Sequence, residues 1–222
     1  MTDSLLTEIM PDQTTYIVML SGGVSSFEAA RRTIELRGRD CVRLWFADTR
    51  TEDEDLYRFL ADIETFFDLP IRRFNCGADV WDVFDRERMI GNTRADLCSR
   101  ILKREPLWKA RASEFTPDNC ISILGLDWTE PHRINKSISA HHPWRIEFPL
   151  DTPPLWTKIE VIDAMKLLGL KPPRLTSMGF PHNNCGGFCV KAGQAQFAQL
   201  LRVFPERYAY HERREREWQL LM

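Results

Sequence analysis

The feature that most constrains the fold is a short apolar run that ends in a glycine turn. Residues 16–20 read Tyr-Ile-Val-Met-Leu, and Ser21-Gly22-Gly23-Val24-Ser25-Ser26 follows directly. The run predicts a strand, and the apolar periodicity after it predicts a helix over 25–36. Glycines between a strand and a helix let the backbone approach an anion, toward which free N–H groups at the helix start point. The turn is therefore a candidate phosphate site; an ordinary strand-to-helix turn is the alternative.

The rest of the N-terminal two thirds repeats this alternation of strand and helix. Strands are predicted over 42–47, 71–74 and 120–124, and helices over 52–67, 80–88 and 99–112. Four alternations with short connections predict a parallel sheet covered by helices. Ligands bind such sheets at the carboxyl ends of the strands. Residues 21–26, 48–49 and 125–127 all follow strands at that edge, which supports a ligand site there.

The C-terminal third does not continue the regular alternation of strand and helix. Four prolines interrupt the pattern between residues 143 and 154, and helices are predicted over 158–168, 192–203 and 205–221. The chain shows no internal repeat and no flexible linker. We therefore expect a single domain over 1–222, with a core of about 14–150 and a C-terminal elaboration over 151–222.

Composition excludes some classes of protein. The chain has 222 residues, 43% hydrophobic and 28% charged, which is typical of soluble globular proteins. No apolar run approaches the ~20 residues that span a bilayer, and no secretion signal is recognisable, so we expect a cytoplasmic protein. A net charge of −2 argues against nucleic-acid binding by bulk electrostatics. A basic run over 94–111 is the exception, either as a solvated helix face or as a phosphate-facing surface.

Six cysteines in a cytoplasmic chain argue against a disulfide framework. Cys41, Cys76 and Cys120 lie in or beside apolar runs and are predicted to be buried. The remaining three are Cys98, Cys185 and Cys189, and His182 lies three residues before Cys185. Together they suffice for a zinc site, and the three thiols alone for an iron–sulfur cluster or for persulfide chemistry. Isolated cysteines in a glycine turn are the structural alternative.

Taken in order, these segments resemble the phosphoadenosine-phosphosulfate-reductase-like branch of the PP-loop, or adenine nucleotide α-hydrolase, superfamily. Residues 21–26 are similar to its Ser-Gly-Gly-x-Asp-Ser loop, and residues 46–49 to its second-strand nucleotide motif. Residues 98–107 resemble a segment in which a cysteine precedes Lys-x-x-Pro-Leu. Residues 125–133 resemble a Gly-x-x-x-x-Glu-x-x-Arg loop, and residues 184–189 fall where family members carry a second cysteine cluster. Pro149, Leu150 and Trp156 match a further family pattern.

The resemblance implies a Rossmann-like (HUP-type) α/β fold that binds ATP and Mg²⁺ and releases AMP and pyrophosphate. It implies that Asp48 and Thr49 border the adenosine, and that Lys103 or Arg133 supplies positive charge. A surface salt bridge with Glu130 is the alternative role for Arg133. Phosphates are expected on Ser21, Gly22, Gly23, Ser25 and Ser26, with Gly125 and Glu130 completing the nucleotide site and Cys98, Cys185 and Cys189 handling sulfur.

The chain departs from the family pattern in two places. Ser25 stands where the loop usually has aspartate, so Asp48, Asp127 or Glu130 would have to hold Mg²⁺. Residues 211–222 contain no cysteine, whereas sulfonucleotide reductases carry a nucleophilic cysteine in their C-terminal tail. The second departure argues against a thioredoxin-dependent reductase.

These observations predict an ATP pyrophosphatase that adenylates a nucleic acid for sulfur insertion, most simply in DNA phosphorothioation. The sulfur donor would be a cysteine desulfurase, and DNA would dock near residues 94–111; a homodimer is compatible with this prediction. The alternatives are tRNA thiolation, a sulfonucleotide-reductase-like enzyme, and a non-catalytic, zinc-stabilised nucleotide-binding subunit. The cysteines serve sulfur handling, a 4Fe–4S cluster or zinc in these different hypotheses.

Overall fold

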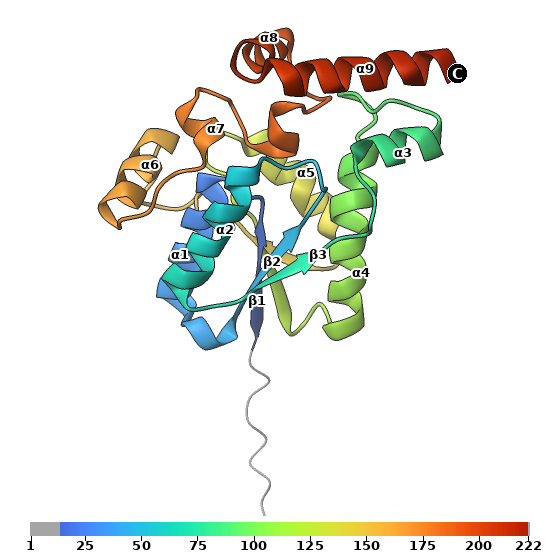
Figure 1. Cartoon of the computed structure of the whole chain (residues 1–222). Helices are drawn as coiled ribbons and strands as arrows, with labels where there is room; N and C mark the ends of the chain where they lie inside the picture. The colour runs from blue at the N-terminus through green and yellow to red at the C-terminus, as the bar shows by residue number, and fades with distance from the viewer. Residues whose placement is uncertain (1–13, 222) are drawn as a thin grey trace, which may run out of the picture.

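The computed structural model describes residues 14–221 and contains a five-stranded sheet (Figure 1). The order of the strands is β3-β2-β1-β4-β5, and all neighbours are parallel. The prediction of a parallel α/β sheet flanked by helices is therefore confirmed. The strands are β1 (Thr15–Leu20), β2 (Val42–Ala47), β3 (Ile71–Phe74), β4 (Cys120–Ile123) and β5 (Arg145–Glu147).

Helices cover both faces of this sheet (Figure 1). On one face, α1 (Val24–Arg37), α2 (Glu54–Phe67) and α6 (Lys158–Leu167) share a buried apolar core with β1 and β2. On the other face, Ile17 and Trp45 pack against Leu107 of α4 (Glu105–Glu114). α5 (Pro131–His141) connects β4 to β5. Burial on both faces explains why β1, β2 and β4 read as nearly continuous apolar runs.

A second group of helices lies across the carboxyl ends of the strands (Figure 1). Its core contains Trp81, Phe188 and Leu200, and the buried ring of His211 stacks on Phe188 with 3.7 Å between centroids. The Trp81 indole donates a 3.0 Å hydrogen bond to His211 Nδ1. The elements are α3 (Val80–Glu87), a π-helical turn η2 (Ser99–Arg104), α7 (Arg174–Ser177), a 3₁₀ turn η3 (Asn184–Gly187), α8 (Gln194–Val203) and α9 (Pro205–Leu221).

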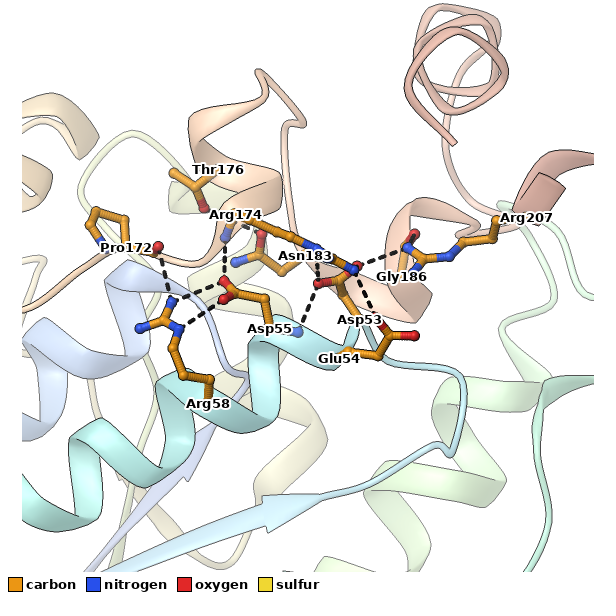
Figure 2. A network of polar contacts seen from close by, with 10 residues as sticks. All are labelled: Asp53, Glu54, Asp55, Arg58, Pro172, Arg174, Thr176, Asn183, Gly186 and Arg207. Carbon is orange, nitrogen blue, oxygen red and sulfur yellow. Dashed lines mark hydrogen bonds and ion pairs between the residues drawn. The ribbon is translucent and has the colours of Figure 1, made fainter. Parts of the chain in front are cut away.

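A polar network joins this C-terminal group to the start of α2 (Figure 2). The buried Asp53 carboxylate caps α2 and pairs with both Arg174, at 2.8 and 2.9 Å, and Arg207, at 2.8 Å. Arg207 also donates to the Gly186 carbonyl at 2.7 Å. Asp55 accepts from the Arg174 backbone N–H at 2.7 Å. The network fixes η3 and α7 over the sheet edge.

The structure corrects several sequence-based predictions. Residues 131–147 form α5 and the edge strand β5, which were not predicted, and the helix predicted over 99–112 is divided between η2 and α4. Cys41 and Cys120 are buried as predicted, but the prediction for Cys76 is wrong because this side chain is exposed. None of the described helices combines the length and apolar character needed to cross a bilayer.

Candidate functional site

The order of the strands determines where a ligand site can form. Because β1 lies between β2 and β4, the helices after β1 and β4 leave on different sides and a crevice opens between the carboxyl ends of these two strands. A cavity of about 620 Å³ lies there, a volume typical of small-molecule sites. It is lined by the 21–26 turn, by the loop and helix after β4, by the start of α6 and by residues 181–184.

The 21–26 turn is pre-formed by its own hydrogen bonds. The Ser26 hydroxyl accepts from the Ser21 N–H at 3.2 Å and donates to the Gly23 carbonyl at 2.8 Å. Gly22 has a φ of +72°, and a Cβ there would lie 2.5 Å from Leu56 Cδ1, so only glycine fits. No side chain caps α1 at Gly23. The first N–H groups of α1 are thus available to an anion in the cavity.

Two residues hold this turn from outside. A Cβ on Gly125 would lie 2.9 Å from the Ser25 carbonyl oxygen and the Ser26 nitrogen, so the loop after β4 touches the turn directly. The buried Asn183 amide donates to the Gly22 carbonyl at 3.3 Å, and Thr176 donates to Asn183 Oδ1 at 3.2 Å. Sequence reasoning missed Asn183, since only the fold brings residue 183 against residue 22.

Charged side chains line the opposite wall of the cavity. Arg133 forms the ion pair with Glu130 that we considered as its alternative role, and both residues line the cavity. Lys158 donates to the Pro181 carbonyl at 2.8 Å. Burial and then the nearby Lys158 lower the pKa of His182, whose Nδ1 is buried without a hydrogen-bond partner in the described structure. Asp127 is the remaining carboxylate in the wall.

Two residues expected at the nucleotide do not line this cavity. Asp48 accepts from the Tyr57 hydroxyl and from the Arg50 N–H, both at 2.8 Å. Thr49 is buried and donates to Glu52 at 3.0 Å. Both side chains are occupied in fixing the turn after β2. The structure therefore brings together Ser21, Gly23, Ser25, Ser26, Gly125, Glu130, Arg133 and His182 around the cavity, with Gly22 beneath them.

Glu52 is the principal residue that sequence reasoning missed. Its fully buried carboxylate accepts from Thr49 Oγ1 and Lys103 Nζ, each at 3.0 Å, and from the Cys185 N–H at 2.8 Å. Burial opposes the charge on Lys103, but the pair with Glu52 outweighs it and raises the pKa of Lys103. Lys103 thus faces this carboxylate and does not line the cavity. No signal in the acidic run 52–55 distinguishes Glu52 from its neighbours.

The three cysteines gather next to this ion pair. Cys98 and Cys185 are buried in one apolar cluster, and Cys189 is half-buried. A hydrogen bond between the two sulfurs raises the pKa of Cys185 and lowers that of Cys189 to about 6, with a further contribution from Lys103. Burial raises the pKa of Cys98. The pair follows Asn184 of the cavity wall but does not itself line the cavity.

Zinc or an iron–sulfur cluster held by Cys98, His182, Cys185 and Cys189 stays a prediction. Within residues 14–221, no three His, Cys, Asp or Glu side chains converge as metal ligands. His182 lines the cavity, and Cys98, Cys185 and Cys189 do not. For Mg²⁺, which needs one or two carboxylates beside substrate phosphates, Asp127 and Glu130 are suitable donors.

Of the six cationic side chains in the basic run 94–111, four are paired or buried, and Arg94 and Lys109 are exposed. Arg104 pairs with Asp96, Arg100 pairs with Glu105, and Lys103 pairs with Glu52. Arg111 is buried, where it donates to Ser122 and lies 4.2 Å from the Trp144 ring. Most of the charge that the sequence displays is thus neutralised or inaccessible.

No protein-family model matches the sequence, and no curated protein matches it. Among solved structures, the fold is similar to that of phosphoadenylyl-sulfate (PAPS) reductase from Candida auris, determined as a phosphate complex. The two chains are 14% identical, and the match covers 79% of this chain and 82% of the reductase chain with a TM-score of 0.52. At this identity the similarity shows a shared fold.

Proposed function

We propose that the protein binds an adenine nucleotide through its phosphates in the cavity between β1 and β4 and cleaves the phosphate chain. The observation that carries this proposal is the 21–26 turn, where the uncapped start of α1 faces the cavity. A helix start with free N–H groups favours anions through both hydrogen bonds and the helix dipole. The fold shared with a nucleotide-dependent enzyme supports the same assignment.

The reaction we favour is the release of pyrophosphate from ATP. Attack at the α-phosphorus requires little covalent chemistry from the protein, but it requires positive charge on the leaving group. The α1 N–H groups would bind the leaving phosphates, and Arg133 and Lys158 would add positive charge from the opposite wall. Mg²⁺ held by Asp127 and Glu130 would neutralise phosphate charge. Ser25, in place of the usual aspartate, would contribute a hydroxyl only.

The adenylated product would then accept sulfur. DNA phosphorothioation with a cysteine desulfurase as donor remains our proposal for the acceptor, and tRNA thiolation is its alternative. The polymer would dock near residues 94–111, where Arg94 and Lys109 are exposed and Arg100 and Arg104 keep partly exposed side chains. If turnover is absent under all conditions, the remaining proposal is a nucleotide-binding partner subunit.

A sulfonucleotide-reductase-like activity is a second candidate, and two observations favour it. The similar solved structure is a PAPS reductase. In addition, Cys185 and Cys189 form a hydrogen-bonded thiol pair directly after Asn184 of the cavity wall. One thiolate of such a pair would attack the sulfonate sulfur in place of the tail cysteine of the reductases and release the nucleotide phosphate. The second thiolate would then attack the cysteine sulfur of the thiosulfonate, which releases sulfite and leaves the pair as a disulfide.

The test is the product pattern of the anaerobically purified protein. ATP with Mg²⁺, with and without DNA or tRNA, should give AMP and pyrophosphate; an adenosine phosphosulfate that gives sulfite instead would select the second candidate. Ser21→Ala combined with Ser26→Ala should abolish either activity while the far-UV circular dichroism stays unchanged. Ser113→Ala, on the exposed end of α4, is the matched control. Full activity in the double variant would refute the site.

A further inference from the structure

The loop 185–189 folds back on itself, with Cys185 at its start and Cys189 at its end. The Phe188 N–H donates to the Cys185 carbonyl at 2.9 Å, which closes a tight turn. Cys185, Gly186 and Gly187 all have positive φ, of 53°, 58° and 94°. Positive φ is uncommon for a residue with a Cβ, so the strained Cys185 conformation has to be held by its surroundings. Cys189 follows at the other end of the turn, and each of the two thiols shifts the pKa of the other.

Contacts from three other segments hold the turn: the segment after β2, α8 and α9. The Cys185 N–H donates to Glu52, and the Gly186 carbonyl accepts from Arg207. A Cβ on Gly186 would lie 3.0 Å from the Thr51 carbonyl, so this part of the turn is packed against the segment after β2. Gln196 of α8 donates to the Gly187 carbonyl at 2.8 Å. The two sulfurs are therefore placed by the fold and not by a flexible loop.

The two thiols differ in their access to solvent. Cys185 is 6% exposed, whereas Cys189 is half-buried. Cys98 is buried in the same apolar cluster, and Cys76 is exposed but lies outside that cluster. A reagent from solvent therefore reaches Cys189 before Cys185. This order is that of an attacking thiol in front of a resolving thiol.

We propose that Cys185 and Cys189 form a redox-active dithiol that exchanges with low-molecular-weight disulfides, Cys189 as the attacking and Cys185 as the resolving thiol. The Cys189 thiolate attacks one sulfur of the disulfide and releases the other half as a thiolate. Cys185 then loses its proton and attacks the Cys189 sulfur, which releases the second half as a thiolate. The protein pair is oxidised by two electrons to a disulfide, and the reagent is reduced to two thiols. The proposal does not depend on nucleotide binding.

The experiment uses the aromatic disulfide dithiobis-nitrobenzoate, whose released thiolate absorbs visible light. The full-length chain carries Cys76→Ser, which removes the exposed cysteine outside the cluster. Trypsin produces one peptide, residues 175–191, that contains both reacting cysteines because no Lys or Arg lies between them and Arg174. The release of the coloured thiolate is followed by absorbance with one equivalent of reagent per protein chain. The mass of the 175–191 peptide is then measured by mass spectrometry.

In the Cys76→Ser protein we expect both halves of the reagent to be released rapidly and the 175–191 peptide to be lighter by two hydrogens. With Cys185→Ser added, release should stop at one half, with the other half attached to Cys189. With Cys189→Ser added, the rapid phase should disappear. A rapid phase that survives Cys189→Ser, a reagent that stays attached to both cysteines, or a disulfide to Cys98 would overturn the assignment. The peptide mass of the Cys76→Ser protein decides the question even if a cysteine variant fails to fold.

Discussion

Glu52→Gln is the sharpest test of the buried ion pair beside the thiol loop, residues 185–189. The substitution keeps the shape and an oxygen that accepts from the Cys185 N–H, but it removes the charge opposite Lys103. Removing one partner of a buried ion pair costs about 3–5 kcal/mol. Since the Lys103 side chain keeps 24% exposure, we expect the lower end, about 3 kcal/mol. At about 2–4 °C per kcal/mol for a chain of this size, the melting temperature should fall by roughly 6–12 °C.

The assay is urea unfolding of the variant and of two companions. Glu52→Gln with Lys103→Met removes the charge on both sides, and should recover most of the lost free energy of unfolding because no buried charge is left unpaired. Glu54→Gln is the control, since that side chain is 85% exposed and should change stability by less than about 0.5 kcal/mol. A loss below about 1 kcal/mol in Glu52→Gln, or a double variant no more stable than the single one, would refute the reasoning.

Two further predictions concern the 21–26 turn and His211 in the core of the second group of helices. Gly125→Ala would place a Cβ 2.9 Å from backbone atoms of Ser25 and Ser26, so we expect phosphate to bind at least about tenfold more weakly by calorimetry; Gly193→Ala, where nothing lies within 4 Å, should leave binding unchanged. Burial and then Arg207 lower the pKa of His211 to about 3, so below about pH 6.5 the unfolded chain takes up a proton that the folded chain does not. As the pH falls from 6.5 to 3, this group should therefore lower the free energy of unfolding by about 1.4 kcal/mol per pH unit. His211→Gln should show a shallower dependence of unfolding free energy on pH. Parallel pH profiles for the variant and the unmodified protein would contradict the assignment.

The strands of the core could be predicted from the sequence because each is a compact apolar run with turn residues on both sides. β2 and β3 have the predicted bounds, and α1 and α2 differ by one or two residues. The edge strand β5 could not be found, since three residues, Arg145–Glu147, provide no alternation to detect. α5 buries only Ile134 along its length, which leaves little apolar period. The π-helical turn η2 depends on a shift of backbone hydrogen bonds that side-chain patterns do not record.

Predicting the site depended on which residues follow strands. Residues after β1 and β4 meet in the cavity because parallel strands end at one edge, and this geometry follows from the alternation alone. The ion-pair partners of charged residues could not be predicted in the same way. The charges of Lys103 and Arg104 are visible in the sequence, but Glu52 and Asp96 are recognisable as their partners only once the helices are packed.

The C-terminal third is part of the site and not an addition to a finished domain. Thr176, His182 and Asn183 close one wall of the cavity, and the Asn183 amide holds the carbonyl of Gly22 beneath the phosphate turn. Two residues later, Cys185 begins the turn 185–189. The Cys185 N–H donates to Glu52, which lies in the segment after β2. A ligand that moved the 21–26 turn would therefore act on the same short segment that positions the thiols. Because residues 183–185 contact the segments that follow both β1 and β2, the proposed nucleotide site and the proposed thiol pair would share one structural support.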